Sequence, residues 1–141
     1  MASTGYTTMR TPTANKGMAF TEEQRDQLKL RGLLPVGVTS MEFETERAMM
    51  QIRRKTSPLE KYIFMQNMQN SNEDVYYRML INHTSELMPI VYTPTVGQGC
   101  QEFSHIYNQQ PRGLFISVND IGRVAEILDN WPEKDIRAIC F

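Results

Sequence analysis

Residues that build disulfide frameworks and metal sites are scarce in this sequence. Its 141 residues include only two cysteines, Cys100 and Cys140, and two histidines, His83 and His105. A structural zinc site needs four ligands, so the sequence predicts neither a zinc site nor a histidine-based metal cluster. A chain of this size does not need a disulfide, and we expect reduced thiols in an intracellular compartment rather than the one disulfide that is possible.

Long apolar runs and an excess of either charge are also missing. The net charge is −1, and the lysines and arginines do not gather in any one segment. Nucleic-acid-binding proteins usually carry a basic stripe, so that class is disfavoured. No apolar run approaches the roughly 20 residues that span a bilayer. With 40% hydrophobic residues, the sequence predicts one soluble domain that has a core and no nucleic-acid or membrane partner.

The first 16 residues have no acidic side chain and are rich in serine and threonine. They contain no apolar h-region, which argues against a secretory signal. We expect a flexible tail over residues 1–16, although a short organellar presequence is conceivable. The sequence therefore favours a cytoplasmic protein, with a mitochondrial location as the alternative.

Four helices are predicted in the first half of the chain, over about 22–30, 40–55, 58–69 and 73–82. Thr21, Thr39 and Ser57 are expected to cap the first three, because each is followed three residues later by glutamine or glutamate. Pro58 strengthens the third start, since proline suits the first helical position. At helical spacing, the side chains expected to face the core are Phe43, Met49, Met50, Ile52, Leu59, Tyr62, Ile63, Met68, Val75, Tyr76, Met79 and Leu80.

The second half alternates between short apolar runs and helical patterns. The runs at 89–92, 113–118 and 136–141 predict strands, and the segments 95–107 and about 120–130 predict helices, the first capped by Thr95 and the second by Asn119 or Asp120. This order is typical of parallel β-sheet units. We therefore expect an α/β fold, with a helical region over 20–88 followed by a truncated, mostly parallel β-α-β-α-β unit over 89–141. Because the sequence ends on an apolar run, it looks cut rather than finished.

The segment 91–97, Val-Tyr-Thr-Pro-Thr-Val-Gly, is the strongest candidate for a functional site. It places Tyr92 at the carboxyl end of an expected strand and just before a helix N-terminus, where ligands and anions often bind. A tyrosine can act as general acid or base when its surroundings lower its pKa. The alternative, which the pattern alone favours, is a core tyrosine whose hydroxyl bonds to the backbone. Cys100 could be a reactive thiol near Tyr92, but we expect a buried and inert one.

The segment 91–97, with Leu87-Met88-Pro89-Ile90 before it, resembles the signature of the malic enzymes. Further blocks resemble family segments in the same order, and together they cover roughly residues 15–141. These blocks are Asn15-Lys16-Gly17, Phe20-Thr21, Gly32-Leu33-Leu34-Pro35, residues 56–62, residues 111–117 and residues 129–133.

The resemblance implies an activity and a role for Tyr92. Malic enzymes oxidise L-malate with NAD or NADP and decarboxylate it to pyruvate and carbon dioxide, with Mg²⁺ or Mn²⁺ bound. In the family a tyrosine acts as general acid and protonates the enolate that decarboxylation leaves. By its position in the motif, Tyr92 is expected to carry that role. The family also implies a homo-oligomer that forms through its N-terminal helices.

The family's general-base lysine, its acidic metal ligands and its Gly-rich nucleotide-binding domain would all lie beyond Phe141. We therefore expect residues 17–141 to be the N-terminal domain of a malic enzyme, inactive by itself. The alternative is a stand-alone, non-catalytic module that binds malic enzyme subunits. A small enzyme of other chemistry centred on Tyr92 is disfavoured, because no general base is placed beside the tyrosine.

Some animal members bind fumarate at a dimer-interface site with one glutamine and two arginines. Arg47 falls where one arginine belongs, whereas Glu44 stands at the glutamine position and Ser71 at the second arginine position. Loss of one cation and gain of one anion would repel a dicarboxylate. The sequence therefore predicts no fumarate activation through this site.

Overall fold

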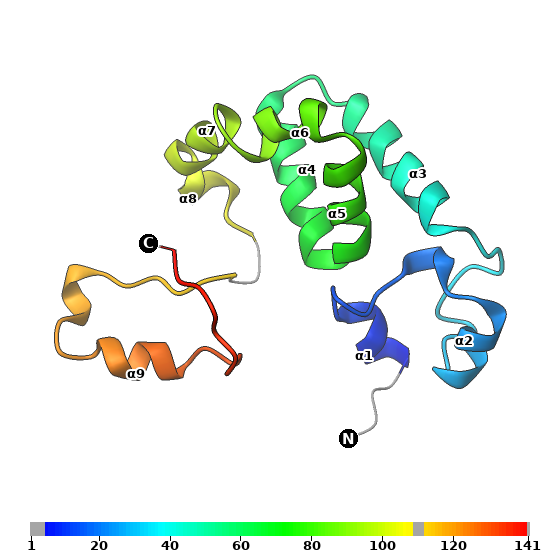
Figure 1. Cartoon of the computed structure of the whole chain (residues 1–141), viewed down its shortest axis with the longest axis horizontal. Helices are drawn as coiled ribbons and strands as arrows, with labels where there is room; N and C mark the ends of the chain where they lie inside the picture. Colours follow the sequence, from blue (N-terminus) through cyan, green and yellow to red (C-terminus); the bar gives the residue numbers. More distant parts are fainter. Residues whose placement is uncertain (1–4, 109–111, 141) are drawn as a thin grey trace. The chain divides into compact units, whose positions relative to one another are not determined.

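The computed structural model describes residues 5–108 and 112–140, and within these ranges the regular elements are all helical (Figure 1). The chain divides into two compact units, Met1–Gln109 and Gln110–Phe141. The first unit contains α1 (Gly5–Arg10), the 3-10 helix η1 (Gly17–Ala19), α2 (Glu22–Gln27), α3 (Met41–Arg53), α4 (Pro58–Ser71), α5 (Glu73–Asn82), α6 (Thr84–Val91), α7 (Thr95–Gln101) and α8 (Phe103–Ile106). The second contains the 3-10 helix η2 (Val118–Asp120) and α9 (Val124–Asp129).

The core of the first unit lies among α3, α4, α5 and α6, and α5 packs against the other three (Figure 1). Its members recur at helical spacing, so each of these helices presents one apolar stripe to its neighbours. Burying each large side chain stabilises the fold by about 1.5–3 kcal/mol relative to leaving it exposed. The core residues, each exposed by 2% or less, are Ala48, Met49, Ile52, Met65, Val75, Met79 and Leu87.

Two of the predicted helix starts are confirmed. The Thr21 hydroxyl accepts the Gln24 N–H at 3.2 Å, and the Gln24 side chain accepts the Thr21 N–H at the same distance. Ser57 accepts the Glu60 N–H at 3.5 Å, with Pro58 as the first residue of α4. Such caps depend only on residues within one turn of each other, so the local sequence is enough to specify them.

The predicted start of α3 is wrong by one residue, since Ser40 rather than Thr39 caps it and accepts the Phe43 N–H at 3.1 Å. Phe43 and Met50, also expected in the core, are 48% and 52% exposed. Met49 and Ile52, which were also expected there, do lie in the core, together with Ala48.

Residues 5–16, expected to form part of a flexible tail, pack against the first unit. A Cβ atom at Gly5 would lie 2.5 Å from the Lys29 carbonyl oxygen, so α1 approaches that backbone closely. The Glu73 N–H donates to the Pro12 carbonyl at 3.0 Å, and Asn15 Nδ2 donates to the Ser71 carbonyl at 2.7 Å. These bonds tie the start of the described chain to the junction of α4 and α5.

The predicted α/β fold is wrong for the residues that the structure describes, because they form no strand and only one isolated bridge. The apolar run at 89–92 belongs largely to α6, where Leu87 is buried and Ile90 and Val91 pack on the core. Over such a short run, a strand and a buried helix segment have the same hydrophobic pattern. The helix expected over 95–107 is present, but as α7 and α8 with a break at Glu102.

The other two expected strands, at 113–118 and 136–141, fall in the second unit. Residues 112–117 and 132–140 have no regular secondary structure, and Phe141 lies outside the described residues. None of the residues described in this unit is buried, although many are apolar. Ser117 and Asp120 form the caps of η2, and α9 begins only at Val124, later than predicted. A strand needs a second strand for its backbone groups, and no strand pairing is formed among the residues described in this unit.

A search of the described helices for a segment long and apolar enough to cross a membrane finds none.

Candidate functional site

The turn between α6 and α7 carries Tyr92. α6 ends at Val91, so its last four carbonyls lack partners within the helix. The Tyr92 N–H donates to the Met88 carbonyl at 2.8 Å, and the Thr95 hydroxyl donates to the Pro89 carbonyl at 2.7 Å. The Tyr92 carbonyl accepts the Val96 N–H at 2.9 Å. The backbone of Tyr92 is therefore bonded on both sides.

The side chain of Tyr92 is presented to solvent, with the residue 63% exposed. The structure thus places it at the C-cap of a helix, and the predicted position at the end of a strand is wrong. The alternative of a core tyrosine is excluded by the same exposure. A phenol held on a fixed backbone and facing outward can donate a proton to a molecule that binds beside it.

Helix α7 is anchored on α4 directly after this turn. A Cβ atom at Gly99 would lie 2.8 Å from Cε1 of the Tyr62 ring, so only a glycine allows this approach. Thr95, at the start of α7, is 5% exposed. Thr95 was expected to cap the helix, but Pro94 is the N-cap residue and the threonine hydroxyl bonds back to α6 instead. This bond spans six residues and encloses Tyr92.

No group of three or more His, Cys, Asp or Glu side chains that could hold a metal ion occurs in the described ranges. The residues described around Tyr92 therefore do not fit a divalent metal. Cys100, expected to be buried, is exposed on α7.

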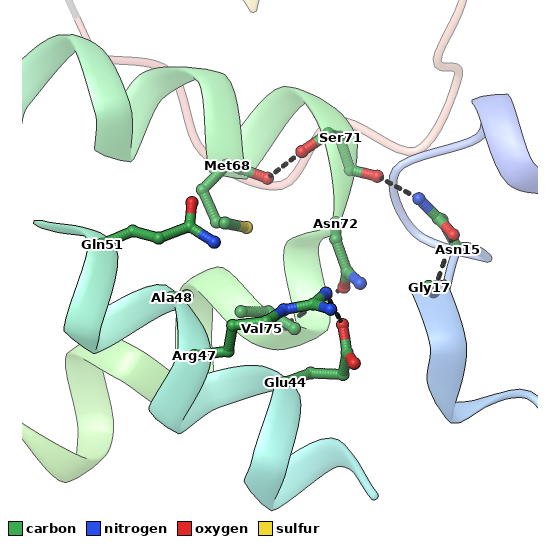
Figure 2. A pocket seen from close by; sticks show the side chains of 10 residues that line it. All are labelled: Asn15, Gly17, Glu44, Arg47, Ala48, Gln51, Met68, Ser71, Asn72 and Val75. Carbon is green, nitrogen blue, oxygen red and sulfur yellow. Dashed lines mark hydrogen bonds and ion pairs between the residues drawn. The ribbon is translucent and has the colours of Figure 1, made fainter. Parts of the chain in front are cut away.

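A second site lies between the start of the chain and helices α3, α4 and α5 (Figure 2). We call it the polar pocket; its volume is about 190 Å³. Its lining residues are Asn15, Gly17, Glu44, Arg47, Ala48, Gln51, Met68, Ser71, Asn72 and Val75. The structure thus brings together Glu44, Arg47 and Ser71, which the sequence suggested only as counterparts of a fumarate site.

Glu44 and Arg47, both lining the polar pocket, form an ion pair, as Figure 2 shows. The side chain of Glu44 is only 4% exposed, and its second oxygen accepts the Thr39 hydroxyl at 2.7 Å. An anion that enters the pocket would meet a guanidinium that already has a carboxylate partner. Ser71 is uncharged, and its hydroxyl donates to the Met68 carbonyl at 3.2 Å.

Arg53, at the end of α3, connects this helix to α6. Arg53 donates from Nε and Nη2 to the two carboxylate oxygens of Glu86 at 3.0 and 2.7 Å. These hydrogen bonds lower the pKa of Glu86 below its ordinary range, and the charge of Arg53 adds to the effect. His83 lies between α5 and α6, so it ends one helix and begins the next.

Sequence reasoning missed Asn15 and Asn72 as parts of the polar pocket and missed the role of Thr95. The Asn15 side chain bonds to a carbonyl 56 positions away, which no local pattern indicates. Asn72 has a local signal, since it lies three residues before Val75 and its side chain caps α5 by accepting the Val75 N–H at 3.1 Å. Threonine is common at the N-cap position, so the sequence favours a cap at Thr95, whereas its hydroxyl bonds the Pro89 carbonyl of α6.

Comparisons with known proteins give a consistent result. A family profile described as malic enzyme, N-terminal domain, matches residues 69–141. A chloroplastic NADP-dependent malic enzyme of Zea mays is 47% identical over 138 residues, which are 98% of this chain and 22% of that protein. NADP-dependent malic enzyme 1 of Arabidopsis thaliana is 47% identical over 137 residues, which are 97% of this chain and 23% of that protein. The chain spans between a fifth and a quarter of the length of these curated relatives.

Proposed function

Because this chain belongs to the malic enzyme family, we propose that it serves the oxidative decarboxylation of L-malate to pyruvate and carbon dioxide, as the N-terminal part of such an enzyme. The relatives that match most of this chain are named as NADP-dependent, so we propose NADP rather than NAD as the hydride acceptor. A divalent metal and the nucleotide are assigned to no residue described here, and the activity of the chain by itself is expected to be absent.

The role proposed for Tyr92 is that of the general acid. Decarboxylation leaves an enolate, and the phenolic O–H transfers its proton to the carbon that becomes the pyruvate methyl group. The phenolate that remains must then be reprotonated before the next turnover. The observation that supports this role is the exposed phenol on a backbone bonded on both sides, within the segment that resembles the family signature.

A chimera tests this proposal, with residues 5–141 replacing the matching segment of the Zea mays enzyme. Tyr92→Phe removes only the hydroxyl, so kcat should fall by about 10²-fold or more while KM for malate changes little. The matched control is Tyr77→Phe on α5, a tyrosine that is 48% exposed and remote in sequence from the turn, and it should retain full kcat. Normal turnover by the Tyr92→Phe chimera would remove the tyrosine from the proposed role. A folded but inactive unsubstituted chimera would contradict the proposed reaction.

The second candidate is a non-catalytic module that binds malic enzyme subunits. It is favoured by Phe43 and Met50, two large apolar side chains about two turns apart on the exposed face of α3. The same face would also support a homo-oligomer of this chain. Sedimentation of the chain with and without the Zea mays enzyme separates the two: a complex only in the mixture supports the module, and self-association alone supports the homo-oligomer.

A further inference from the structure

We propose that Thr95 is a positioning residue for Tyr92, acting through the hydrogen bond from its hydroxyl to the Pro89 carbonyl. This inference rests on the role proposed for Tyr92 above. It concerns a residue that touches neither substrate nor cofactor and that acts by fixing the turn on which the tyrosine stands.

The carbonyl that Thr95 bonds belongs to the last turn of α6, where carbonyls lack partners within the helix. Pro89 is among the last four residues of α6, whose carbonyls cannot all find partners within the helix. The Met88 carbonyl is bonded by the Tyr92 N–H. For the Ile90 carbonyl, the residue four positions on is Pro94, which has no N–H to offer. The backbone alone therefore closes this end of α6 incompletely, and the Thr95 hydroxyl bonds to the Pro89 carbonyl at 2.7 Å.

The bond from Thr95 encloses the residue that it would position. It joins positions 89 and 95, and Tyr92 lies midway between them. Within this loop the Tyr92 N–H donates to the carbonyl of Met88, the residue before Pro89. The Tyr92 carbonyl accepts the N–H of Val96, the residue after Thr95. The three bonds fix the path of the backbone on both sides of Tyr92, whereas its side chain remains outward-facing.

The two helices that the Thr95 hydrogen bond joins, α6 and α7, both pack against other helices of the first unit. On the α6 side, Leu87 is 1% exposed in the core. On the α7 side, Gly99 lies against the Tyr62 ring of α4. Since α6 and α7 are held in this way, the Thr95 bond determines the geometry of the short segment between them.

The buried position of Thr95 makes its hydroxyl hard to replace. Thr95 is 5% exposed, so water cannot readily take over a hydrogen bond that the side chain loses. Valine has the same shape without the donor and would leave the Pro89 carbonyl without this partner. The turn would then sample other paths, and a displacement of about 1 Å at a reacting group can cost on the order of 10²-fold in rate.

The test uses the chimera described above with Thr95→Val, Thr95→Ser and Thr45→Val. Thr45 is the matched control, because it is 3% exposed and its hydroxyl also bonds a backbone carbonyl at 2.7 Å, but it lies on α3. We expect Thr95→Val to lower kcat about tenfold with KM for malate within about twofold, and Thr95→Ser to restore most of the loss. Thr45→Val should lower the melting temperature as much as Thr95→Val does and leave kcat unchanged.

A double-mutant cycle separates positioning from general loss of structure. In the Tyr92→Phe background, Thr95→Val should lower kcat no further, because the group that it positions is already gone. An equal, additional loss in that background would overturn the proposal, as would normal kcat in the Thr95→Val variant alone. Neither result touches the role of Tyr92, which fails only if Tyr92→Phe retains turnover. Thr95→Ala removes the same hydroxyl and replaces the valine variant if the latter does not fold.

Discussion

Glu44 and Arg47 determine what the polar pocket can accept. The Glu44 carboxylate is buried and bonded to both Arg47 and Thr39, so the pair stays together in the folded protein. The net charge of the pair is zero, and Ser71 brings no cation. A dicarboxylate would have to displace an internal carboxylate from the guanidinium and would lie beside it afterwards, where like charges repel.

We therefore predict that titrating the chain with fumarate up to millimolar concentration gives no saturable heat in calorimetry. Glu44→Gln removes the competing charge and keeps the shape, and it is the variant in which weak binding should first be detectable. Fumarate binding by the unsubstituted chain that disappears in Arg47→Gln would contradict this account of the pocket.

Tyr92 illustrates how far a single position can be predicted. The motif from 91 to 97 selects the residue, and the structure shows its side chain exposed to solvent. The surroundings were predicted wrongly, because the prediction depended on a strand at 89–92, which the structure replaces with a helix. The identity of a candidate residue came from the local motif, whereas its setting depends on packing partners distant in sequence.

The packing of α7 against α4 can be tested with two glycines of α7, because only one of them lies in the contact. At Gly99 a Cβ would meet the Tyr62 ring at 2.8 Å, whereas at Gly97 nothing lies within 4 Å. Gly99→Ala should destabilise the protein by about 1–3 kcal/mol through overpacking. Gly97→Ala should be neutral or stabilise by up to about 1 kcal/mol, since alanine favours helix. Urea unfolding measures both, and equal effects of the two substitutions would show that the contact does not form.

The ion pair between Arg53 of α3 and Glu86 of α6 predicts a pH dependence. Arg53 lowers the pKa of Glu86 in the folded state, so the pair stabilises the fold above the ordinary glutamate pKa of about 4.3 and loses this effect as pH falls through the lowered value. Both side chains are about half exposed, at 50% and 44%, so solvent screens the two charges and keeps the contribution small.

The measurement compares the native chain with Glu86→Gln in urea at several pH values. The native chain should be more stable near pH 7, and the difference should shrink as the pH falls below the ordinary glutamate pKa. High salt should also reduce the difference at pH 7, because these charges are exposed. A difference that is constant from pH 3 to 7 would mean that the substitution acts through packing and not through charge.

At the level of helices, elements specified by neighbouring residues were predicted correctly, and elements that depend on partners distant in the sequence were not. The caps at Thr21 and Ser57 were predicted correctly, because both partners of each cap lie within one turn. The strands expected at 89–92, 113–118 and 136–141 depended on pairing with one another, which composition cannot test. The register of α3 was wrong by one residue, since Thr39 and Ser40 are both good caps and the choice rests on what Thr39 bonds instead.

Across the whole molecule, the two units differ in how much they bury. The first has a core of side chains exposed by 2% or less, whereas the second has no buried residue among those described. Local opening costs little free energy where few apolar contacts must be broken. We therefore predict that the helical unit is stable and that the segment 112–140 has low local stability.

Hydrogen exchange followed by mass spectrometry or NMR checks this prediction. Amides in α3, α4 and α5 should exchange at least about 10³-fold more slowly than unstructured amides, and those in residues 112–140 should exchange within about tenfold of unstructured rates. Protection in 112–140 equal to that of the core helices would contradict it. The same comparison in the chimera would show whether a longer chain covers the apolar side chains of this segment.

The bonds that tie Asn15 and Pro12 to the junction of α4 and α5 set an order of events during synthesis. Asn15 leaves the ribosome before Ser71, whose carbonyl it bonds and which lies 56 positions later. At the usual rate of translation this delay is roughly 3 to 11 seconds, far longer than a helix takes to form. The bonds of Pro12 and Asn15 can therefore form only after Ser71 and Glu73 have been made, although α1 can approach the Lys29 backbone much earlier.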